Sequence, residues 1–221
     1  MVMRQSRKII TLPVIAIMKK LGLYSLYSLR ESGPLKEDGW FRSFSEQASI
    51  DAEGNPLPWI TYPAIDFLKK RVTKEMSVFE YGAGGSTLWW ASRVKDVVAV
   101  EHDRQWFDKV LKALPANVDL HHVKLEYGGA YCRTVAAYRE RFDIVVVDGR
   151  DRVNCIKNCL TALKQRGVVI LDNSERNEYT EGKKYLQHSG FRSIEFIGAC
   201  PIVNLKSETS IFYRDNNILS I

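Results

Sequence analysis

Segments that suit buried strands alternate with segments that suit helices from residue 76 to residue 189, and this alternation restricts the fold most. Short runs rich in Val, Ile and Phe are each followed by a stretch with one apolar helical face. Such alternation predicts an α/β protein with a doubly wound, mostly parallel sheet. We expect strands at 76–80, 97–101, 118–124, 142–148 and 167–172, and helices at 86–93, 104–114, 131–140, 153–165 and 178–189.

The end of the chain departs from this pattern. Two extended runs, 191–197 and 209–213, follow one another with no helical segment between them. We therefore expect an antiparallel hairpin that closes a seven-stranded sheet. A helix at 62–71, with its apolar residues on one face, precedes the first strand.

The first 60 residues have a different character. Residues 1–30 suit an arm with one helix, whereas residues 31–60 hold closely spaced Gly and Pro with large aromatic residues between them. We predict an N-terminal arm and loop-rich cap segment at residues 1–60 and an α/β domain at residues 61–221. With 221 residues, of which 45% are hydrophobic, the chain is long enough to bury a substantial core.

The net charge of +6 is concentrated at the N-terminus. Residues 1–20 contain five basic residues and no acid, which leaves +1 for the rest of the chain. A broad basic face for nucleic acid is therefore not expected. The apolar run at residues 9–18 is too short to cross a bilayer. We expect it to contact a membrane surface, a partner subunit in a homo-oligomer, or its own domain.

The four cysteines do not form a C-x-x-C pair, so neither a zinc site nor a redox pair is expected. We predict buried, reduced thiols in a reducing compartment. The protein is accordingly expected in the cytoplasm, with contact to a membrane limited to the N-terminal arm.

A glycine-rich turn joins the first strand to the helix that follows it. Glu80 is followed by the turn 82–85, and Ser86 then begins a helical stretch. Glycine lets the backbone approach a ligand closely, and the start of the helix presents free N–H groups there. The next strand ends about twenty residues on in Glu101, where an acid can bind the hydroxyls of a ribose. The segment therefore predicts a nucleoside site.

The turn does not fit the dinucleotide fingerprint, because Thr87 stands where the third glycine of G-x-G-x-x-G would be. The acid before the turn would repel a pyrophosphate and suits a cationic ligand. The pattern Glu80-x-Gly82-x-Gly84-x-Ser86, with Glu101 downstream, resembles the first two motifs of the class I S-adenosylmethionine-dependent methyltransferases.

This resemblance implies S-adenosylmethionine as the cofactor and a Rossmann-like methyltransferase fold, for which the closing hairpin is typical. It places Glu80, Gly82, Gly84 and Ser86 at the methionine end of the cofactor and Glu101 at the ribose. The same resemblance places four more residues near the cofactor, namely His102, Glu126, Tyr127 and Asp148. A loop histidine with no ligand is the alternative for His102.

A second group of polar residues follows the fourth and fifth strands. Asp148 ends one of them, and the pair Asp172-Asn173 ends the other. The carboxyl ends of parallel strands meet at one edge of the sheet, so these oxygens are expected to converge, and such oxygens suit Mg²⁺. The arrangement is similar to that of the divalent-cation-dependent O-methyltransferases, including the catechol O-methyltransferase group. A helix-capping turn at Asn173 and a metal-free role for Asp148 are the alternatives.

The resemblance implies Mg²⁺ held by Asp148, Asp172 and Asn173, where it would lower the pKa of a substrate hydroxyl. That group carries a lysine base three residues after the strand-four aspartate, but this chain has an aspartate there, between Arg150 and Arg152. A guanidinium is a poor base and a good clamp for a carboxylate or phosphate. We therefore expect Asp148 and one of these arginines to act in catalysis, with solvated charge as the alternative for the arginines.

The sequence thus predicts an enzyme that transfers a methyl group to a small-molecule acceptor, at a hydroxyl oxygen of a sugar or secondary metabolite. A nucleic-acid methyltransferase is disfavoured, because no Asn/Asp-Pro-Pro-aromatic motif follows the fourth strand. A nicotinamide-dependent oxidoreductase is disfavoured by the missing third glycine. A non-catalytic assembly protein that binds the cofactor or a nucleotide remains as the alternative.

Overall fold

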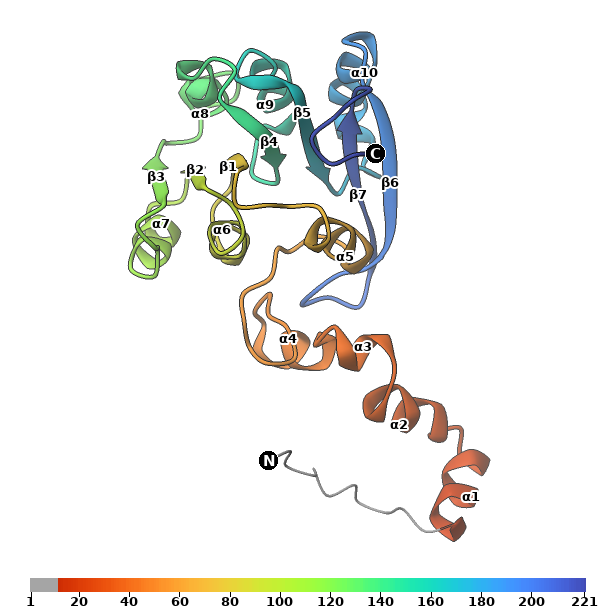
Figure 1. Ribbon diagram of the computed structural model, residues 1–221. Helices are drawn as coiled ribbons and strands as arrows, with labels where there is room; N and C mark the ends of the chain where they lie inside the picture. The colour runs from red at the N-terminus through yellow and green to blue at the C-terminus, as the bar shows by residue number, and fades with distance from the viewer. Residues whose placement is uncertain (1–11) are drawn as a thin grey trace.

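The strand-like runs of the sequence pair into one sheet at the centre of the α/β part of the computed structural model, which describes residues 12–221 (Figure 1). The sheet order is β3-β2-β1-β4-β5-β7-β6. The first five strands are parallel, and β7 runs antiparallel to both β5 and β6. The strands are β1 Ser77–Tyr81, β2 Asp96–Glu101, β3 Val118–His122, β4 Phe142–Val147, β5 Leu163–Asp172, β6 Arg192–Ala199 and β7 Lys206–Tyr213.

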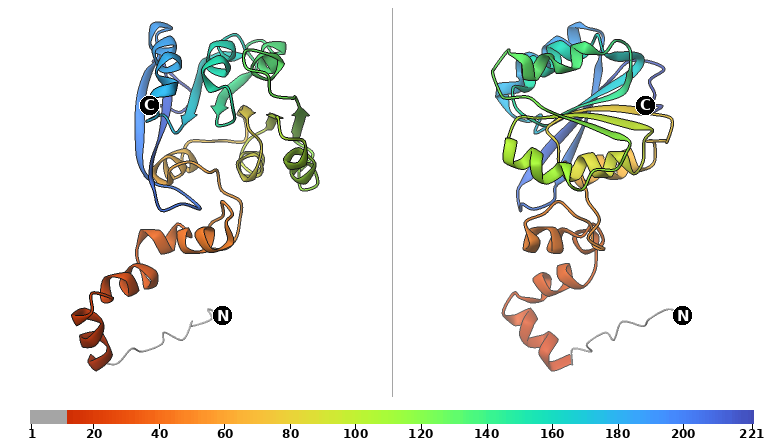
Figure 2. Two further views of the ribbon diagram at one scale, coloured as in Figure 1. Left: turned by 180° about the vertical axis from the view of Figure 1, so that it is seen from behind. Right: turned by 90° about the vertical axis from the view of Figure 1, so that its left-hand side faces the viewer.

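Helices cover both faces of the sheet (Figures 1 and 2). Side chains alternate along β1, so that Val78 packs in the core beneath α5 and α6 while Phe79 packs in the core beneath α8 and α9. One face carries α5 Tyr62–Lys69, α6 Gly85–Ala91 and α7 Arg104–Leu111, and the other carries α8 Ala130–Arg133, α9 Arg152–Cys159 and α10 Thr180–His188, with 3₁₀ turns at Thr134–Ala137 and Asn177–Tyr179. This is the predicted doubly wound α/β fold with its closing hairpin.

Some element boundaries differ from those predicted. The helix expected at 153–165 ends at Cys159, and β5 begins at Leu163. Leu163 is buried and pairs with Phe142, and a register shift precedes the next pair. Residues from Leu163 onward therefore belong to β5 and not to the helix. The helix expected at 131–140 is split into α8 and a 3₁₀ turn, and β3 ends two residues early.

The N-terminal part of the chain is more helical than predicted. It contains α1 Leu12–Lys20, α2 Tyr24–Glu31, α3 Pro34–Glu37 and α4 Trp40–Glu46, which extend away from the sheet (Figures 1 and 2). Neither α1 nor α2 has a buried residue, so the described part of the arm is not packed on its own domain. The first part of the predicted apolar run, residues 9–11, lies outside the described residues.

Helix α4 docks on the connection between β6 and β7. The indole Nε1 of Trp40 donates to the carbonyl of Val203 at 2.8 Å, and the amide of Ile202 donates to the hydroxyl of Ser43 at 2.9 Å. Because Asp172 at the end of β5 pairs with Thr209 near the start of β7, this connection lies at the carboxyl edge of the parallel strands. The N-terminal segment therefore contacts the edge where ligands bind in open α/β sheets.

Two further predictions concern membranes and cysteines. No single helix among residues 12–221 is long and apolar enough to cross a membrane. Helices α1 and α2 together meet the requirements of length and apolar composition, but the chain bends by 119° between them.

All four cysteines are free and buried, as predicted.

Candidate functional site

The glycine turn lies where the order of the strands reverses. Strand β1 has β2 on one side and β4 on the other, so the loops after β1 and β4 meet at a topological switch point. Gly82 has φ +89°, and a Cβ there would lie 2.9 Å from the Cα of Gly149. Only glycine fits this approach without strain, and the two loops therefore form one continuous surface at the carboxyl edge.

Glu80 lies fully buried beneath this turn. The hydroxyl of Thr87 donates to its Oε2 at 2.5 Å, and the same hydroxyl accepts from the amide of Gly84 at 2.9 Å. The other carboxylate oxygen, Oε1, makes no hydrogen bond to any group of residues 12–221. Burial raises the pKa of Glu80 to about 7, against the opposing effect of the hydroxyl groups of Ser86 and Thr87. A buried acceptor without a partner is costly, and a cationic donor placed there would relieve that cost.

Glu101 ties the glycine turn to the start of α7. Its Oε1 accepts from the amides of His102 and Asp103 at 2.7 and 2.8 Å, and its Oε2 accepts from the amide of Ala83 at 3.2 Å. The side chain is almost fully buried, and Nδ1 of His102 lies 2.8 Å from Oε1. The carboxylate is therefore held in place at the end of β2, next to the turn, as the sequence predicted.

Two aromatic residues at this edge were not predicted from the sequence. The indole of Trp106 donates to the carbonyl of Ala83 at 2.6 Å. The hydroxyl of Tyr131 is buried and has no hydrogen-bond partner among the described residues, and a Cβ on Gly149 would lie 2.1 Å from it. Asp103 caps α7 through the amide of Trp106, and this N-cap pattern could have located the indole. No local signal marks Tyr131.

Glu126 and Tyr127 lie in the turn that follows β3. Both are exposed, and neither side chain makes a hydrogen bond within residues 12–221. They belong to a tight turn after β3, in which the amide of Gly128 donates to Oδ2 of Asp151 at 2.8 Å. The turn is thus tied to the loop after β4, and contact of these side chains with a cofactor stays a prediction.

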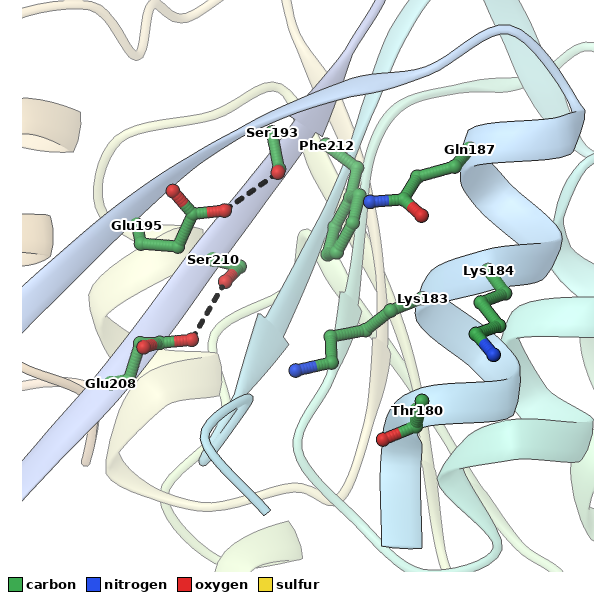
Figure 3. Close-up of a pocket in the computed structure, with 9 residues that line it drawn as sticks. All are labelled: Thr180, Lys183, Lys184, Gln187, Ser193, Glu195, Glu208, Ser210 and Phe212. Atoms are coloured by element: carbon green, nitrogen blue, oxygen red, sulfur yellow. Dashed lines mark hydrogen bonds between the residues drawn. The ribbon is translucent and has the colours of Figure 1, made fainter. Parts of the chain in front are cut away.

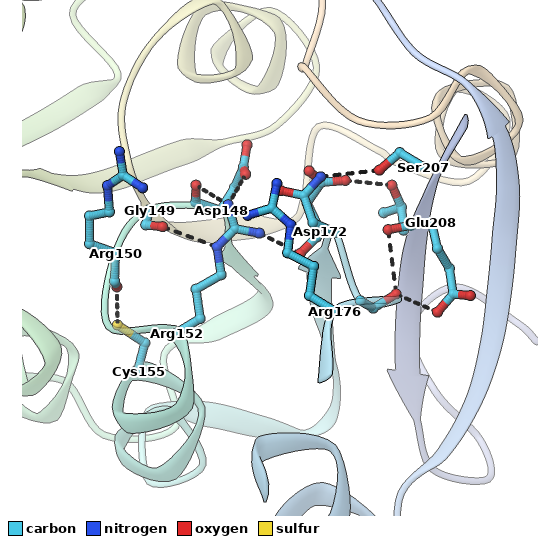
Figure 4. A network of polar contacts seen from close by, with 12 residues as sticks. Asp148, Gly149, Arg150, Arg152, Cys155, Asp172, Arg176, Ser207 and Glu208 are labelled. Atoms are coloured by element: carbon cyan, nitrogen blue, oxygen red, sulfur yellow. Dashed lines mark hydrogen bonds and ion pairs between the residues drawn. The ribbon is translucent and has the colours of Figure 1, made fainter. Parts of the chain in front are cut away.

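Arg152 organises the second group of polar residues (Figure 4). Its Nη2 lies 2.9 Å from Oδ1 of Asp148 and also donates to the carbonyl of that residue at 2.9 Å. Its Nε donates to the carbonyl of Gly149 at 3.0 Å, and its Nη1 donates to the carbonyl of Asp172. The guanidinium is buried and joins the ends of β4 and β5, whereas Arg150 is exposed.

The two aspartates beside Arg152 have raised pKa values. Burial raises the pKa of Asp148 to about 6, although Arg152 opposes the change, and the neighbouring charge of Glu80 adds to it. Burial and the charge of Asp148 raise the pKa of Asp172 to about 8, and Oδ1 of Asp172 accepts from the hydroxyl of Thr209 at 2.7 Å. The buried carboxylates of Glu80 and Asp172 and the half-buried carboxylate of Asp148 thus line the ends of β1, β4 and β5 within reach of one another's charge.

Each of the three predicted magnesium ligands uses one side-chain atom in a bond to the protein, and magnesium binding stays a prediction. The Oδ1 of Asp148 is paired with Arg152, and the Oδ1 of Asp172 is bonded to Thr209. The side-chain amide of Asn173 donates to Ser207 at 3.1 Å. No group of three or more His, Cys, Asp and Glu side chains within the described chain is arranged to hold a metal ion. The buried guanidinium already supplies positive charge beside these carboxylates.

A separate pocket of about 230 Å³ lies on the α10 side of the sheet (Figure 3). Lys183 of α10 points toward the closing hairpin, which contributes Glu195 and Glu208 to the lining, and Lys184 lies along α10. None of the predicted site residues lines this pocket. Its mixed charge does not single out a ligand.

The sequence matches no protein-family model and no curated protein. Solved structures are similar in fold. A SAM-dependent O-methyltransferase (TM0748) of Thermotoga maritima is 18% identical, with 72% of this chain and 67% of that chain covered and a TM-score of 0.54. SMU.1697c of Streptococcus mutans, solved in complex with SAH, is 16% identical, with 67% and 94% covered and a TM-score of 0.51.

The chain has the Rossmann-like methyltransferase fold. An rRNA methylase of Streptococcus thermophilus has the same fold, at 17% identity over 70% of this chain and 98% of that chain, with a TM-score of 0.51. The similar structures include both an rRNA methylase and an O-methyltransferase, so similarity in fold does not identify a methyl acceptor. The fold class expected from the sequence, including the antiparallel hairpin, is confirmed.

Proposed function

We propose that the protein is an S-adenosylmethionine-dependent methyltransferase that acts on a hydroxyl oxygen of a small-molecule acceptor. The observation that carries this proposal is the buried Glu80 carboxylate beneath the glycine turn, whose Oε1 has no hydrogen-bond partner in the described part of the chain. A ligand with a cationic end that reaches this oxygen would satisfy it. The methyltransferase fold supports the same cofactor.

The cofactor is assigned to the edge formed by the loops after β1, β2 and β4. Its methionine end would lie at Glu80, Gly82, Gly84 and Ser86, and its ribose at Glu101. The contacts proposed for its adenine side are with His102, Glu126 and Tyr127. Nδ1 of His102 already lies 2.8 Å from the carboxylate of Glu101, which supports a shared site for these two residues.

The methyl group reaches the acceptor by direct displacement. Bound S-adenosylmethionine supplies an electrophilic methyl group on a sulfonium. Held at Glu80, Gly82, Gly84 and Ser86, the cofactor would supply its methyl group to the acceptor oxygen and leave as the thioether, and Asp148 would take the proton of the acceptor hydroxyl. Partial burial raises the pKa of this carboxyl above its usual range, which suits it to take that proton. Arg152 holds it in a fixed orientation, and positioning accounts for much of the acceleration.

The acceptor is assigned to the class of sugars or secondary metabolites with a free hydroxyl. Residues 1–60 are proposed as a cap segment beside the domain at residues 61–221. A Cβ on Gly85 would lie 3.1 Å from the carbonyl oxygen of Leu57, which supports a cap over the glycine turn. Arg150 is exposed at the same edge and suits a carboxylate or phosphate of the acceptor.

Transfer of a labelled methyl group from S-adenosylmethionine to a pool of hydroxylated metabolites tests the proposal. The protein should label at least one acceptor, and D148N should lower kcat at least tenfold while leaving the Kd of S-adenosylhomocysteine within about twofold. Tight binding with no labelled product in any pool would favour the non-catalytic alternative. Absence of cofactor binding would contradict the proposal altogether.

A further inference from the structure

Helices α1 and α2 carry a cluster of apolar side chains that no other described part of the chain covers. Leu12, Ile17, Leu21 and Leu26 are between 59% and 83% exposed. Neither helix contains a buried residue, and both extend away from the sheet (Figure 1). Folded domains seldom expose apolar side chains in contiguous groups unless these meet another surface. We call this pair of helices, residues 12–31, the arm.

The positive charge of the protein accompanies these apolar residues. Residues 1–30 contain six basic residues and no acid, and the whole chain contains 32 basic and 26 acidic residues. The other 191 residues therefore hold equal numbers of the two. Within the arm, Lys19 and Lys20 form the last turn of α1 and are exposed. The formal charge of +6 thus lies in residues 1–30, and the arm itself holds three of these basic residues together with one acid, Glu31.

We propose that the arm docks on an anionic membrane surface. Its helices have nine and eight residues, whereas about twenty are needed to cross a bilayer. Short helices that combine apolar side chains with basic residues bind in the plane of the membrane interface, where apolar burial and attraction to anionic lipid act together. The break between α1 and α2 turns the chain by 119°, which lets two short helices lie along one surface.

A second copy of the chain is the competing occupant, and the charge disfavours it. Pairing the apolar clusters of two copies would bring two acid-free N-terminal segments together, each with six basic residues. Like charges placed across an interface oppose association. An anionic lipid surface is instead complementary to the same residues.

The arm is connected to the edge of the sheet that carries the candidate site. It leads through α3 into α4, which bonds to the β6–β7 connection through Trp40 and Ser43. Docking would therefore hold the carboxyl edge of the sheet on the membrane side of the protein. This consequence rests on the proposed function, whereas docking itself does not.

Co-sedimentation of the full-length protein with vesicles tests the proposal. The protein should sediment with vesicles of phosphatidylcholine and phosphatidylglycerol and remain in solution with phosphatidylcholine alone. The double variant I17D/L26D should abolish sedimentation, and K19E/K20E should weaken it by about tenfold or more. L111D, at an exposed leucine of α7, is the matched control and should bind like the unaltered protein.

The result does not depend on cofactor binding, so its failure is distinguishable from failure of the proposed function. Absence of sedimentation with the anionic vesicles would overturn the proposal, as would sedimentation that I17D/L26D leaves unchanged. Sedimentation velocity without lipid should show a monomer. A dimer that I17D/L26D dissociates would assign the apolar cluster to a second copy and would also overturn the proposal.

Discussion

Nη2 of Arg152 lies 2.9 Å from Oδ1 of Asp148, and this ion pair lies where the ends of β4 and β5 meet. The side chain of Arg152 is 8% exposed, and its other nitrogens donate to the carbonyls of Gly149 and Asp172. A buried guanidinium with all its main partners at one sheet edge has both a structural and an electrostatic role. It joins two strands and orients the carboxylate that we assign as the proton acceptor.

Removing this guanidinium should destabilise the fold. R152M leaves Asp148 and three carbonyl groups without their donor, so the free energy of unfolding should fall by about 3 kcal/mol. R150M alters an exposed arginine in the same loop and should change it by no more than about 0.5 kcal/mol. Urea denaturation of both variants checks this, and equal effects would contradict the buried role of Arg152.

Turnover should not depend on a divalent cation. Because Arg152 occupies the Oδ1 of Asp148, EDTA should leave kcat within about twofold, and added Mg²⁺ should have a similarly small effect. The assay is methyl transfer in chelated buffer with and without MgCl₂. Loss of activity in EDTA that Mg²⁺ restores would instead support the magnesium site suggested by the sequence.

Stability should fall as the pH rises. The pKa of Asp172 is raised from 3.8 to about 8 in the folded protein, so its contribution to stability is complete below about pH 4 and is lost as the pH approaches 8. Between pH 5 and pH 8, the free energy of unfolding should therefore decrease. D172N, which keeps an acceptor for Thr209, should flatten this dependence. Equal pH profiles for D172N and the unaltered protein would contradict the assignment.

The fold was largely predictable because the strands of a parallel sheet are buried on both faces. Runs such as Ile144 to Val147 are apolar at every position, and only a central strand accommodates them. Boundaries that depend on pairing were less predictable. Leu163 belongs to β5 because it pairs with Phe142 on the neighbouring strand, and the sequence around Leu163 does not indicate this pairing.

The candidate site was predictable in part. Glu80 and Glu101 stand at strand ends next to a glycine turn, and such positions depend on local sequence. The choice between Arg150 and Arg152 was not predictable, because it depends on the direction in which α9 begins after Asp151, whose φ is +53°. Tyr131 reaches Gly149 only through the packing of α8. Tertiary contacts of this kind leave no periodic pattern in the sequence.

Glu101 should be needed for cofactor affinity. E101Q removes charge and one acceptor beside the glycine turn, so the Kd of S-adenosylhomocysteine should rise at least tenfold, because ribose hydrogen bonds are lost. D108N, at a half-exposed acid on α7, is the control and should leave the Kd unchanged. Isothermal titration calorimetry provides the measurement, and unaltered affinity in E101Q would refute the ribose assignment.

The central claim is that Glu80 receives the cationic end of the cofactor, and calorimetric titration with S-adenosylmethionine at pH 6 and pH 8 tests it most directly. In the protein without cofactor, the pKa of Glu80 is raised to about 7, and a bound cation favours the ionised carboxylate. The affinity for S-adenosylmethionine should therefore increase by up to about tenfold from pH 6 to pH 8. E80Q should bind at least tenfold more weakly at pH 8 and lose that portion of the pH dependence. Binding of S-adenosylmethionine by E80Q with unaltered affinity, or no binding by the unaltered protein, would contradict the account.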